Sequence, residues 1–402
     1  MTVDLRTRSD DATTDIAVGA FFAEQFPALL DGFPAYVAPW LAHNRLADLS
    51  IDCDGERWQL RAREGAVDAA PGTADSGLLV RLTAEEFSGL VNDYYTPVTF
   101  FVGGSLDIER GDMGDFLDWW MVLRALVDRR PIHVPGAVEF AGLDGRPLDL
   151  HRSFAPDDPV AEMRHFLESA GFLHIRGLFS EQEMAAISAD MDRYRQEYTE
   201  GDEKSWWATT ADGARRLVRM QGFDRKSQAT ADLLADPRFR SVGDICGVGH
   251  THAGLEGNAI EALVKPLDVV EGISDLPWHK DCSLGRHSYE CCSLTVGVSV
   301  TGAGPSSGQL RVIAGSHRAL MWPSLLRDAS TWGLPRVDLP TQTGDITVHL
   351  SCTHHMAQAP VERERRVLYT SFRLPSVSVT SDTASRARIN RTREAAYRTV
   401  SQ

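Results

Sequence analysis

The sequence predicts an α+β protein in two parts, a small N-terminal α+β domain and a larger C-terminal domain of short strands with flanking helices. Two observations predict this class. In the first third of the chain, segments with strand and helix periodicity alternate between turn residues. In the second half, short apolar and β-branched runs recur between turn residues, a pattern that favours a sandwich or barrel. The length of 402 residues suffices for two or three domains that each bury a core.

Composition excludes several classes of function. With 41 basic and 56 acidic side chains the formal net charge is −15, which disfavours nucleic-acid and anionic-membrane partners because both would repel the chain. A hydrophobic content of 43% with 24% charged residues is typical of a folded globular protein. No apolar run approaches the ~20 residues that span a bilayer, and the first ten residues lack the apolar core of a signal peptide. We therefore expect a soluble, cytoplasmic protein.

The cysteine pattern gives no sign of a zinc or redox motif. None of the six cysteines forms a CxxC pair, so we expect reduced and mostly buried thiols. They are Cys53, Cys246, Cys282, Cys291, Cys292 and Cys352.

The N-terminal third contains five recognisable segments. Residues 49–62 alternate around Asp54-Gly55 and predict a hairpin, and residues 78–82 predict a further strand. Thr83-Ala-Glu-Glu86 is a capping box that opens a helix. Residues 100–108 predict a strand broken at Gly103-Gly104, and residues 114–129 predict a helix with an apolar stripe.

Residues 78–129 resemble the sterol carrier protein domain, a small α+β fold with an apolar tunnel. The matching stretches are Val80-Arg-Leu-Thr-Ala-Glu-Glu-Phe87 and Phe101-Val-Gly-Gly-Ser-Leu-Asp-Ile-Glu-Arg-Gly-Asp112. The resemblance implies a sterol-carrier-like domain over residues 1–130. Such a domain would either bind an apolar ligand or serve only for dimerisation or for covering the catalytic domain.

A stretch rich in Pro, Gly and Asp over residues 131–159 predicts a linker that packs along the surface. A second domain is expected over residues 160–380, followed by a tail over residues 381–402. It opens with a helix from Val160, a strand at 171–177 and a helix from Ser180. Further strands are expected at Leu263–Pro266, Ser293–Val300, Gly308–Ile313, Asp345–Leu350 and Arg366–Leu374.

The sharpest chemical motif is Pro277-Trp-His-Lys-Asp-Cys282. His279 and Asp281 are two residues apart, so in a strand their side chains point to the same face and can share one metal ion. On its own the motif is weak, because a hydrogen-bonded surface pair is the commoner reason for such a spacing.

The downstream sequence strengthens this interpretation. Gly344-Asp345 leads a strand that ends near Ser351-Cys-Thr-His-His355. A histidine from this region would complete two histidines and one carboxylate, the facial set that holds non-haem Fe(II) with positions left open. Arg365 then begins a strand and could pair bidentately with a dicarboxylate cosubstrate.

These motifs, in this order, resemble the phytanoyl-CoA dioxygenase family of Fe(II)/2-oxoglutarate oxygenases over residues 160–375. The resemblance implies a double-stranded β-helix, or jelly roll, with Fe(II) in its mouth, and 2-oxoglutarate and O2 as cosubstrates. It implies His279, Asp281 and His354 as iron ligands and Arg365 as the partner of the cosubstrate C5 carboxylate. The landmarks are Phe166-Leu-Glu-Ser-Ala-Gly-Phe172, Trp278-His-Lys-Asp281, Gly308-Gln-Leu-Arg-Val-Ile-Ala-Gly-Ser-His317, Gly344-Asp345, His349, His354 and Arg365.

The sequence offers three candidates for the distal ligand. Spacing to Gly344-Asp345 and to Arg365 favours His354. His349 would then lie in the core or beside the ligands, and His355 would point away from the metal or toward substrate. Strand alternation places Arg366 on the face opposite Arg365.

The expected function is hydroxylation of an unactivated C–H bond in a lipophilic small molecule or secondary-metabolite intermediate, with release of succinate and CO2. Asp281 argues against halogenation, since related halogenases lose this carboxylate so that chloride can bind. Desaturation or cyclisation on the same site is an alternative. A non-catalytic lipid or sterol carrier with a structural jelly roll is a second, and a zinc or manganese isomerase is a third. The sequence predicts no oligomeric state.

Overall fold

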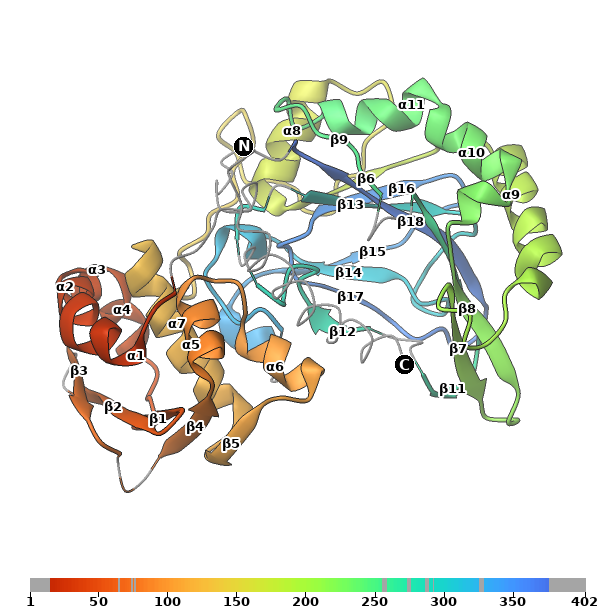
Figure 1. Ribbon diagram of the computed structural model, residues 1–402. Helices are drawn as coiled ribbons and strands as arrows, with labels where there is room; N and C mark the ends of the chain where they lie inside the picture. Colours follow the sequence, from red (N-terminus) through yellow and green to blue (C-terminus); the bar gives the residue numbers. More distant parts are fainter. Residues whose placement is uncertain are drawn as a thin grey trace.

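The computed structural model describes residues 15–63, 66–73, 75, 77–254, 259–272, 276–285, 289–291, 293–324 and 329–375. The chain forms two parts that lie side by side, an N-terminal part with its own sheet and a C-terminal part with two sheets (Figure 1). Helices and antiparallel strands occur in both, as the sequence predicts. Among the described residues, no helix is both long and apolar enough to span a bilayer.

The N-terminal part is a five-stranded sheet covered by helices. The sheet order is β3-β2-β1-β4-β5, and β1 pairs in parallel with β4. Its strands are β1 (Leu49–Cys53), β2 (Glu56–Arg63), β3 (Ala66–Pro71), β4 (Leu78–Leu82) and β5 (Asp107–Arg110). Its helices are α1 (Val18–Ala20), α2 (Phe26–Leu29), α3 (Phe33–Tyr36), α4 (Ala38–Leu41), α5 (Ala84–Val91), α6 (Pro97–Gly103) and α7 (Met113–Asp128), with a π-turn at Phe21–Gln25 and a 3-10 turn at Leu30–Gly32.

The predicted hairpin and helix starts are confirmed. Asp54 and Gly55 both have positive φ, +51° and +91°, which is the type I′ geometry that joins β1 to β2. Thr83 caps α5, and its capping box with Glu86 is complete. The core behind the sheet is dense in aromatic rings, with neighbouring centroids of Phe21, Phe22 and Phe87 5.1–5.6 Å apart.

The prediction of a strand over residues 100–108 was wrong in its first half. Residues 97–103 form helix α6, and the strand β5 begins only at Asp107. Pro97 occupies the first turn of α6, where its missing N–H costs nothing, and Thr96 and Thr99 form a capping box. These start signals outweigh the apolar, β-branched composition of the segment.

Residues 130–159 contain no regular helix or strand and connect the two parts. The connection is held by backbone hydrogen bonds, for example from His133 N to Leu320 O at 2.9 Å.

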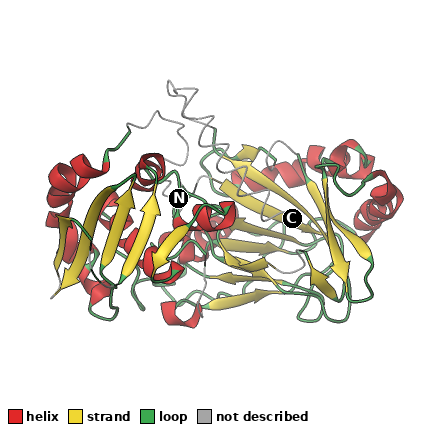
Figure 2. Cartoon of the chain, turned by 60° about the horizontal axis from the view of Figure 1, so that its bottom comes forward, coloured by secondary structure: helices red, strands yellow, loops and turns green. Residues whose placement is uncertain are grey.

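The C-terminal part contains two antiparallel sheets. The larger has the order β11-β7-β8-β10-β18-β13-β16-β6, with β9 also paired to β18, and the smaller has the order β12-β17-β14-β15. Figure 2 shows the strands of both parts in yellow and their helices in red. The larger sheet comprises β6 (Phe172–Ile175), β7 (Ser205–Thr210), β8 (Arg215–Gln221), β9 (Thr251–His252), β10 (Glu261–Lys265), β11 (Val269–Glu271), β13 (Ser293–Ser299), β16 (Ile346–Leu350) and β18 (Arg365–Arg373). The smaller comprises β12 (Leu276–His279), β14 (Leu310–Ile313), β15 (Arg336–Leu339) and β17 (His355–Ala357). Strands cover most of every segment predicted for this half of the chain.

Helices cover the larger sheet (Figure 1). They are α8 (Val160–Ala170), α9 (Glu181–Tyr194), α10 (Gln228–Ala235) and α11 (Pro237–Arg240). The C-terminal part also contains 3-10 turns at Arg195–Glu197, Phe223–Arg225, Ser241–Asp244, Ser316–Arg318 and Ala329–Trp332.

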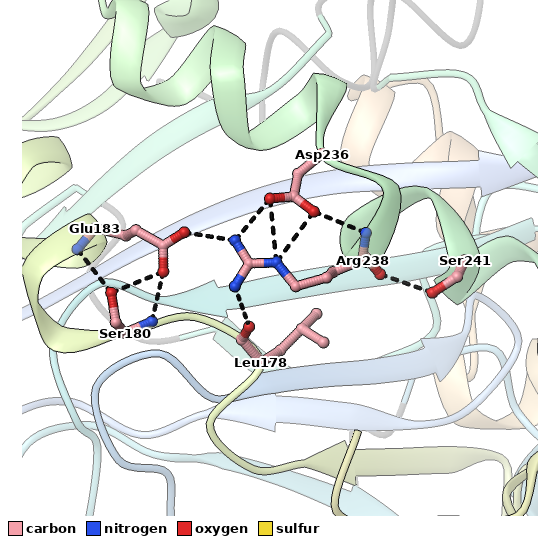
Figure 3. Close-up of polar contacts among 6 residues, drawn as sticks. All are labelled: Leu178, Ser180, Glu183, Asp236, Arg238 and Ser241. Carbon is pink, nitrogen blue, oxygen red and sulfur yellow. Dashed lines mark hydrogen bonds and ion pairs between the residues drawn. The ribbon is translucent and has the colours of Figure 1, made fainter. Parts of the chain in front are cut away.

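One polar network ties two of these helices together. Ser180 caps α9 in a capping box with Glu183, and the Arg238 guanidinium of α11 reaches Glu183, Asp236 and the Leu178 carbonyl (Figure 3). The network fixes the start of α9 against α11 over the edge of the sheet.

The cysteines in the described part of the chain are free thiols, as predicted, and Cys292 lies outside it.

Candidate metal centre

Two neighbouring strands of the smaller sheet bring the first two histidines together. His279 is the last residue of β12, His355 is the first residue of β17, and the two are register partners. Their ring centroids lie 4.3 Å apart. Asp281 follows His279 by two residues in the turn after β12, so its carboxylate faces the same pair. The three residues thus converge from segments 74 positions apart in the sequence (355 − 281).

The donor atoms of this cluster are close enough to hold one ion. Asp281 Oδ1 lies 3.9 Å from His279 Nε2 and 3.3 Å from His355 Nε2. One ligand atom from each of the three residues lies within 4.8 Å of the others. The exposed fractions of the Asp281 and His279 side chains are 31% and 22%, so the cluster opens to solvent on one side.

Each imidazole is oriented through its other nitrogen. His279 Nδ1 lies 2.7 Å from the Pro277 carbonyl and His355 Nδ1 lies 3.0 Å from the Thr353 carbonyl. A carbonyl can only accept, so both Nδ1 atoms donate, and Nε2 is the nitrogen that offers a lone pair whenever either ring is neutral. A carbonyl-oriented tautomer of this kind is the usual partner arrangement of metal-binding histidines.

The second carboxylate oxygen of Asp281 is held from the opposite side. The Thr295 hydroxyl donates to Oδ2 at 2.6 Å, and His349 Nε2 lies 3.5 Å from the same oxygen. Oδ1 is the oxygen that faces the Nε2 atoms of His279 and His355. His349 is buried and its ring centroid lies 4.2 Å from that of His355, so it is a fourth member of the cluster.

Electrostatics favours the ionised form of Asp281 and the neutral form of His279, whereas it favours a proton on His355. Burial lowers the pKa of His279 to about 4, which keeps its imidazole neutral. Burial alone would raise the pKa of Asp281, but His355 and His349 hold it well below its usual value. Burial alone would lower the pKa of His355, but the neighbouring Asp281 carboxylate outweighs burial and raises this pKa. A proton on His355 therefore supplies the positive charge beside Asp281 that a bound metal ion would otherwise supply.

The structure places His354 elsewhere, which corrects the sequence-based choice of the third histidine. His354 is fully buried, and its Nε2 donates to the Trp322 carbonyl at 2.6 Å. Adjacent residues of an extended segment point to opposite faces, so only one of His354 and His355 can meet Asp281. The register of β17 against β12 selects His355. Sequence spacing does not reveal the pairing between β12 and β17. Counting from Gly344-Asp345 therefore selected His354, one residue before the histidine that faces Asp281.

The cluster fits a non-haem iron ion. Two imidazole nitrogens and one carboxylate oxygen are the facial donor set of Fe(II) sites with open coordination positions. The solvent-facing side of the cluster leaves room for further ligands.

A second polar site lies at the start of β18. Arg365 is 2% exposed, and its guanidinium donates to the Gly308 carbonyl at 2.9 Å while its Nε is buried without a hydrogen-bond partner. Lys265 of β10 is the register partner of Arg365 and is 8% exposed. Its Nζ donates to the Gln358 carbonyl at 3.0 Å. Two buried cations therefore lie on neighbouring strands.

Lys265 lies close to β17, the strand that begins with His355. Lys265 Nζ also lies 3.4 Å from the carbonyl of Ala357, two residues after His355. At ~3.3 Å per residue, the Lys265 ammonium therefore lies about 7 Å along β17 from His355. Arg366 points to the other face, as predicted, and forms an ion pair with Asp192 of α9 at 2.8 Å. Lys265 was missed in the sequence because a lone lysine in a strand carries no signal of its register.

Comparison with known proteins gives one family match. Residues 167–366 match the phytanoyl-CoA dioxygenase (PhyH) family. This segment contains all four members of the metal cluster and both buried cations. The N-terminal part lies outside the matched residues, and no curated protein matches the chain.

Several solved structures match part of the chain. The epimerase SnoN in complex with Fe3+, alpha-ketoglutarate and nogalamycin RO is 18% identical, over 53% of this chain and 83% of that one, with a TM-score of 0.42. The carbocyclase SnoK from nogalamycin biosynthesis is 19% identical over 55% and 87%, with a TM-score of 0.42. EctD from S. alaskensis with 2-oxoglutarate and 5-hydroxyectoine is 16% identical over 60% and 86%, with a TM-score of 0.44.

Proposed function

We propose that this protein is a non-haem Fe(II)- and 2-oxoglutarate-dependent oxygenase acting on a small molecule. The observation that carries the proposal is the cluster of His279, Asp281 and His355, whose Nε2 lone pairs and Oδ1 oxygen converge. The match of residues 167–366 to the PhyH family supports it. The two facing antiparallel sheets agree with a double-stranded β-helix.

In this proposal the chain holds iron through His279 Nε2, Asp281 Oδ1 and His355 Nε2. Arg365 and Lys265 bind the distal carboxylate of 2-oxoglutarate, since two buried cations compensate a desolvated carboxylate better than one. With 2-oxoglutarate and O2, bound iron supplies an oxidant that removes hydrogen from an unactivated C–H bond. Thr295 and His349 keep Asp281 ionised and oriented.

Hydroxylation is the reaction we propose first. A retained carboxylate at position 281 occupies the place that a halide would need, so halogenation is disfavoured. Desaturation, epimerisation and cyclisation use the same ligand set and remain alternatives within the proposal.

For the N-terminal part we propose a sterol-carrier-like fold over residues 1–130. Its sheet order with the parallel β1–β4 pair and the capped α5 support the resemblance. Aromatic side chains pack its interior, and the Phe22 and Trp58 rings stack at 5.3 Å. This packing favours a structural role over lipid carriage. The lipophilic character of the substrate therefore rests on the resemblance alone.

An anaerobic titration tests the proposal. Fe(II) and then 2-oxoglutarate are added to the protein, and the visible metal-to-ligand charge-transfer band is followed. We expect a band in the native protein and none in Asp281→Ala. A native protein without the band, or an Asp281→Ala variant that keeps it, would refute the iron site. Succinate formation with candidate substrates then separates oxygenase from carrier.

A further inference from the structure

The N-terminal part holds the turn that follows Asp281. The Thr96 hydroxyl of the N-terminal part donates to the Ser283 carbonyl at 2.6 Å, and the Thr99 hydroxyl of α6 donates to the Leu284 carbonyl, also at 2.6 Å. Figure 1 shows α6 on the side of the N-terminal part that faces the C-terminal sheets. The two carbonyls belong to residues two and three positions beyond Asp281, so their placement fixes the path of the chain at the metal cluster.

Close backbone contact reinforces these hydrogen bonds. Gly285 has φ +135°, and a Cβ at this position would lie 2.3 Å from the Tyr94 carbonyl oxygen. Only glycine permits the two backbones to approach this closely. Beyond it, the Arg130 guanidinium lies 3.9 Å above the Tyr289 ring and 3.2 Å from Glu290.

A second connection reaches the other metal-bearing strand. Asp118 of α7 accepts a hydrogen bond from the Trp322 indole at 2.8 Å, and the Trp322 carbonyl accepts the hydrogen bond from His354. His354 directly precedes His355. The carbonyl of Pro323, the next residue, accepts a hydrogen bond from Lys280 N at 3.1 Å. Ser324 forms an isolated β-bridge with His279.

The apolar contact between the parts is continuous with the N-terminal core. Trp120 and Met121 of α7 belong to one buried cluster with Leu284, Leu320 and Trp322. Leu320 and Met121 are completely buried. The segments that carry the metal ligands therefore pack on α7 as on a core helix.

We propose that the N-terminal part is a positioning scaffold of the metal centre, with α6 and α7 fixing the segments around Asp281 and His355. The hydroxyls of Thr96 and Thr99 are its positioning groups. The expected change in Fe(II) affinity rests on the proposed function. The scaffold itself can also be tested in the metal-free protein.

The test compares two capping boxes in the same part of the chain. Thr96→Val/Thr99→Val removes both hydroxyls that reach Ser283 and Leu284, and each substitution is also made singly. Thr83→Val is the matched control, because Thr83 caps α5 in the same way and, among the described residues, its hydroxyl bonds only within its own capping box. Thr96→Ser/Thr99→Ser restores the hydroxyls without the methyl groups.

Two readouts decide the outcome. In the metal-free protein, amide hydrogen exchange of residues 280–285 should rise in the double valine variant and not in Thr83→Val. Fe(II) affinity should fall about 10- to 100-fold in the same variant, the range typical of lost outer-sphere support, and recover in the serine variant. If the double variant unfolds, the single variants should show intermediate effects.

The scaffold is refuted if Thr96→Val/Thr99→Val and Thr83→Val change exchange and affinity equally. It is also refuted if neither variant changes them. Failure of the iron proposal looks different, because then the native protein itself gives no charge-transfer band while the exchange difference persists.

Discussion

At the scale of single residues, the metal cluster depends on which of two adjacent histidines faces Asp281. His355 Nε2 lies 3.3 Å from Asp281 Oδ1, whereas His354 is bonded to the Trp322 carbonyl. We expect His355→Ala to abolish Fe(II) binding at unchanged fold. His354→Ala should keep Fe(II) binding within about tenfold but lose about 1–3 kcal/mol of unfolding free energy, because it empties a buried, hydrogen-bonded position.

Isothermal titration with Fe(II) under anaerobic conditions and urea unfolding of the two variants provide the measurement. The reverse pattern, in which His354→Ala loses the metal and His355→Ala retains it, would show that spacing rather than strand register identifies the ligand.

His317 makes stability depend on pH. It is 4% exposed, donates to the Glu168 carbonyl at 2.9 Å, and burial lowers its pKa from 6.5 to about 3. Between these values the unfolded chain binds a proton that the folded chain excludes. Stability is therefore fully present above pH 6.5 and falls with acidification toward pH 3, by at most about 1.4 kcal/mol per pH unit from this residue.

His317→Gln should flatten this dependence between pH 6.5 and pH 4, while lowering stability at neutral pH. Urea unfolding of both proteins at several pH values isolates the effect, since all other groups are common to both. Equal slopes for the two proteins would show that His317 does not titrate in the unfolding equilibrium over this range.

At the scale of elements, β18 separates two adjacent arginines by strand alternation. Arg365 faces Lys265 and the interior, and Arg366 faces Asp192 of α9. We expect Arg365→Ala to weaken 2-oxoglutarate about 10- to 100-fold, the loss of a charge-assisted contact. Arg366→Ala should leave 2-oxoglutarate affinity unchanged and lose at most about 1 kcal/mol of stability.

Titration of 2-oxoglutarate into the Fe(II)-loaded variants, followed by the charge-transfer band, measures both affinities. Similar weakening by Arg366→Ala would place the cosubstrate on the wrong face of β18 and overturn the assignment.

The elements also show how far the sequence determines fold and site. Periodicity and turn residues located the β1–β2 hairpin, α5, α7 and the strand that begins at Arg365, because these signals are local. They did not locate β12, which ends at His279. The segment of α6 was misread since short apolar runs suit either helix or strand. His355 and Lys265 are defined by strand pairing between distant segments, and no local pattern encodes that pairing.

At the scale of the whole molecule, net charge and site charge have opposite signs. The chain carries −15, yet the proposed cosubstrate is a dianion. Arg365 and Lys265 provide local positive charge on neighbouring strands inside an acidic protein. Buried charges are screened little by salt, so their effect on the ligand exceeds that of the distant surface carboxylates.

The shared core of the two parts predicts that they unfold together. One buried cluster includes Trp120 of α7 together with Leu320 and Trp322 of the C-terminal part. Separating the parts would expose this apolar surface at about 25 cal/mol per Å2, so neither is expected to remain folded when the other unfolds. Calorimetry of the metal-free protein should show one transition with equal calorimetric and van't Hoff enthalpies.

Thr83→Val provides the internal check, because Thr83 lies in the N-terminal part and its hydroxyl caps α5 by bonding with Glu86. Loss of its cap should cost about 1 kcal/mol. In a single cooperative unit this lowers the midpoint of the whole transition by about 1–2 °C. If the parts were independent, two transitions would appear and the substitution would shift only one of them. Such a result would also remove the physical basis for fixing Asp281 and His355 from α6 and α7, because a part that melts separately contributes little rigidity to its neighbour.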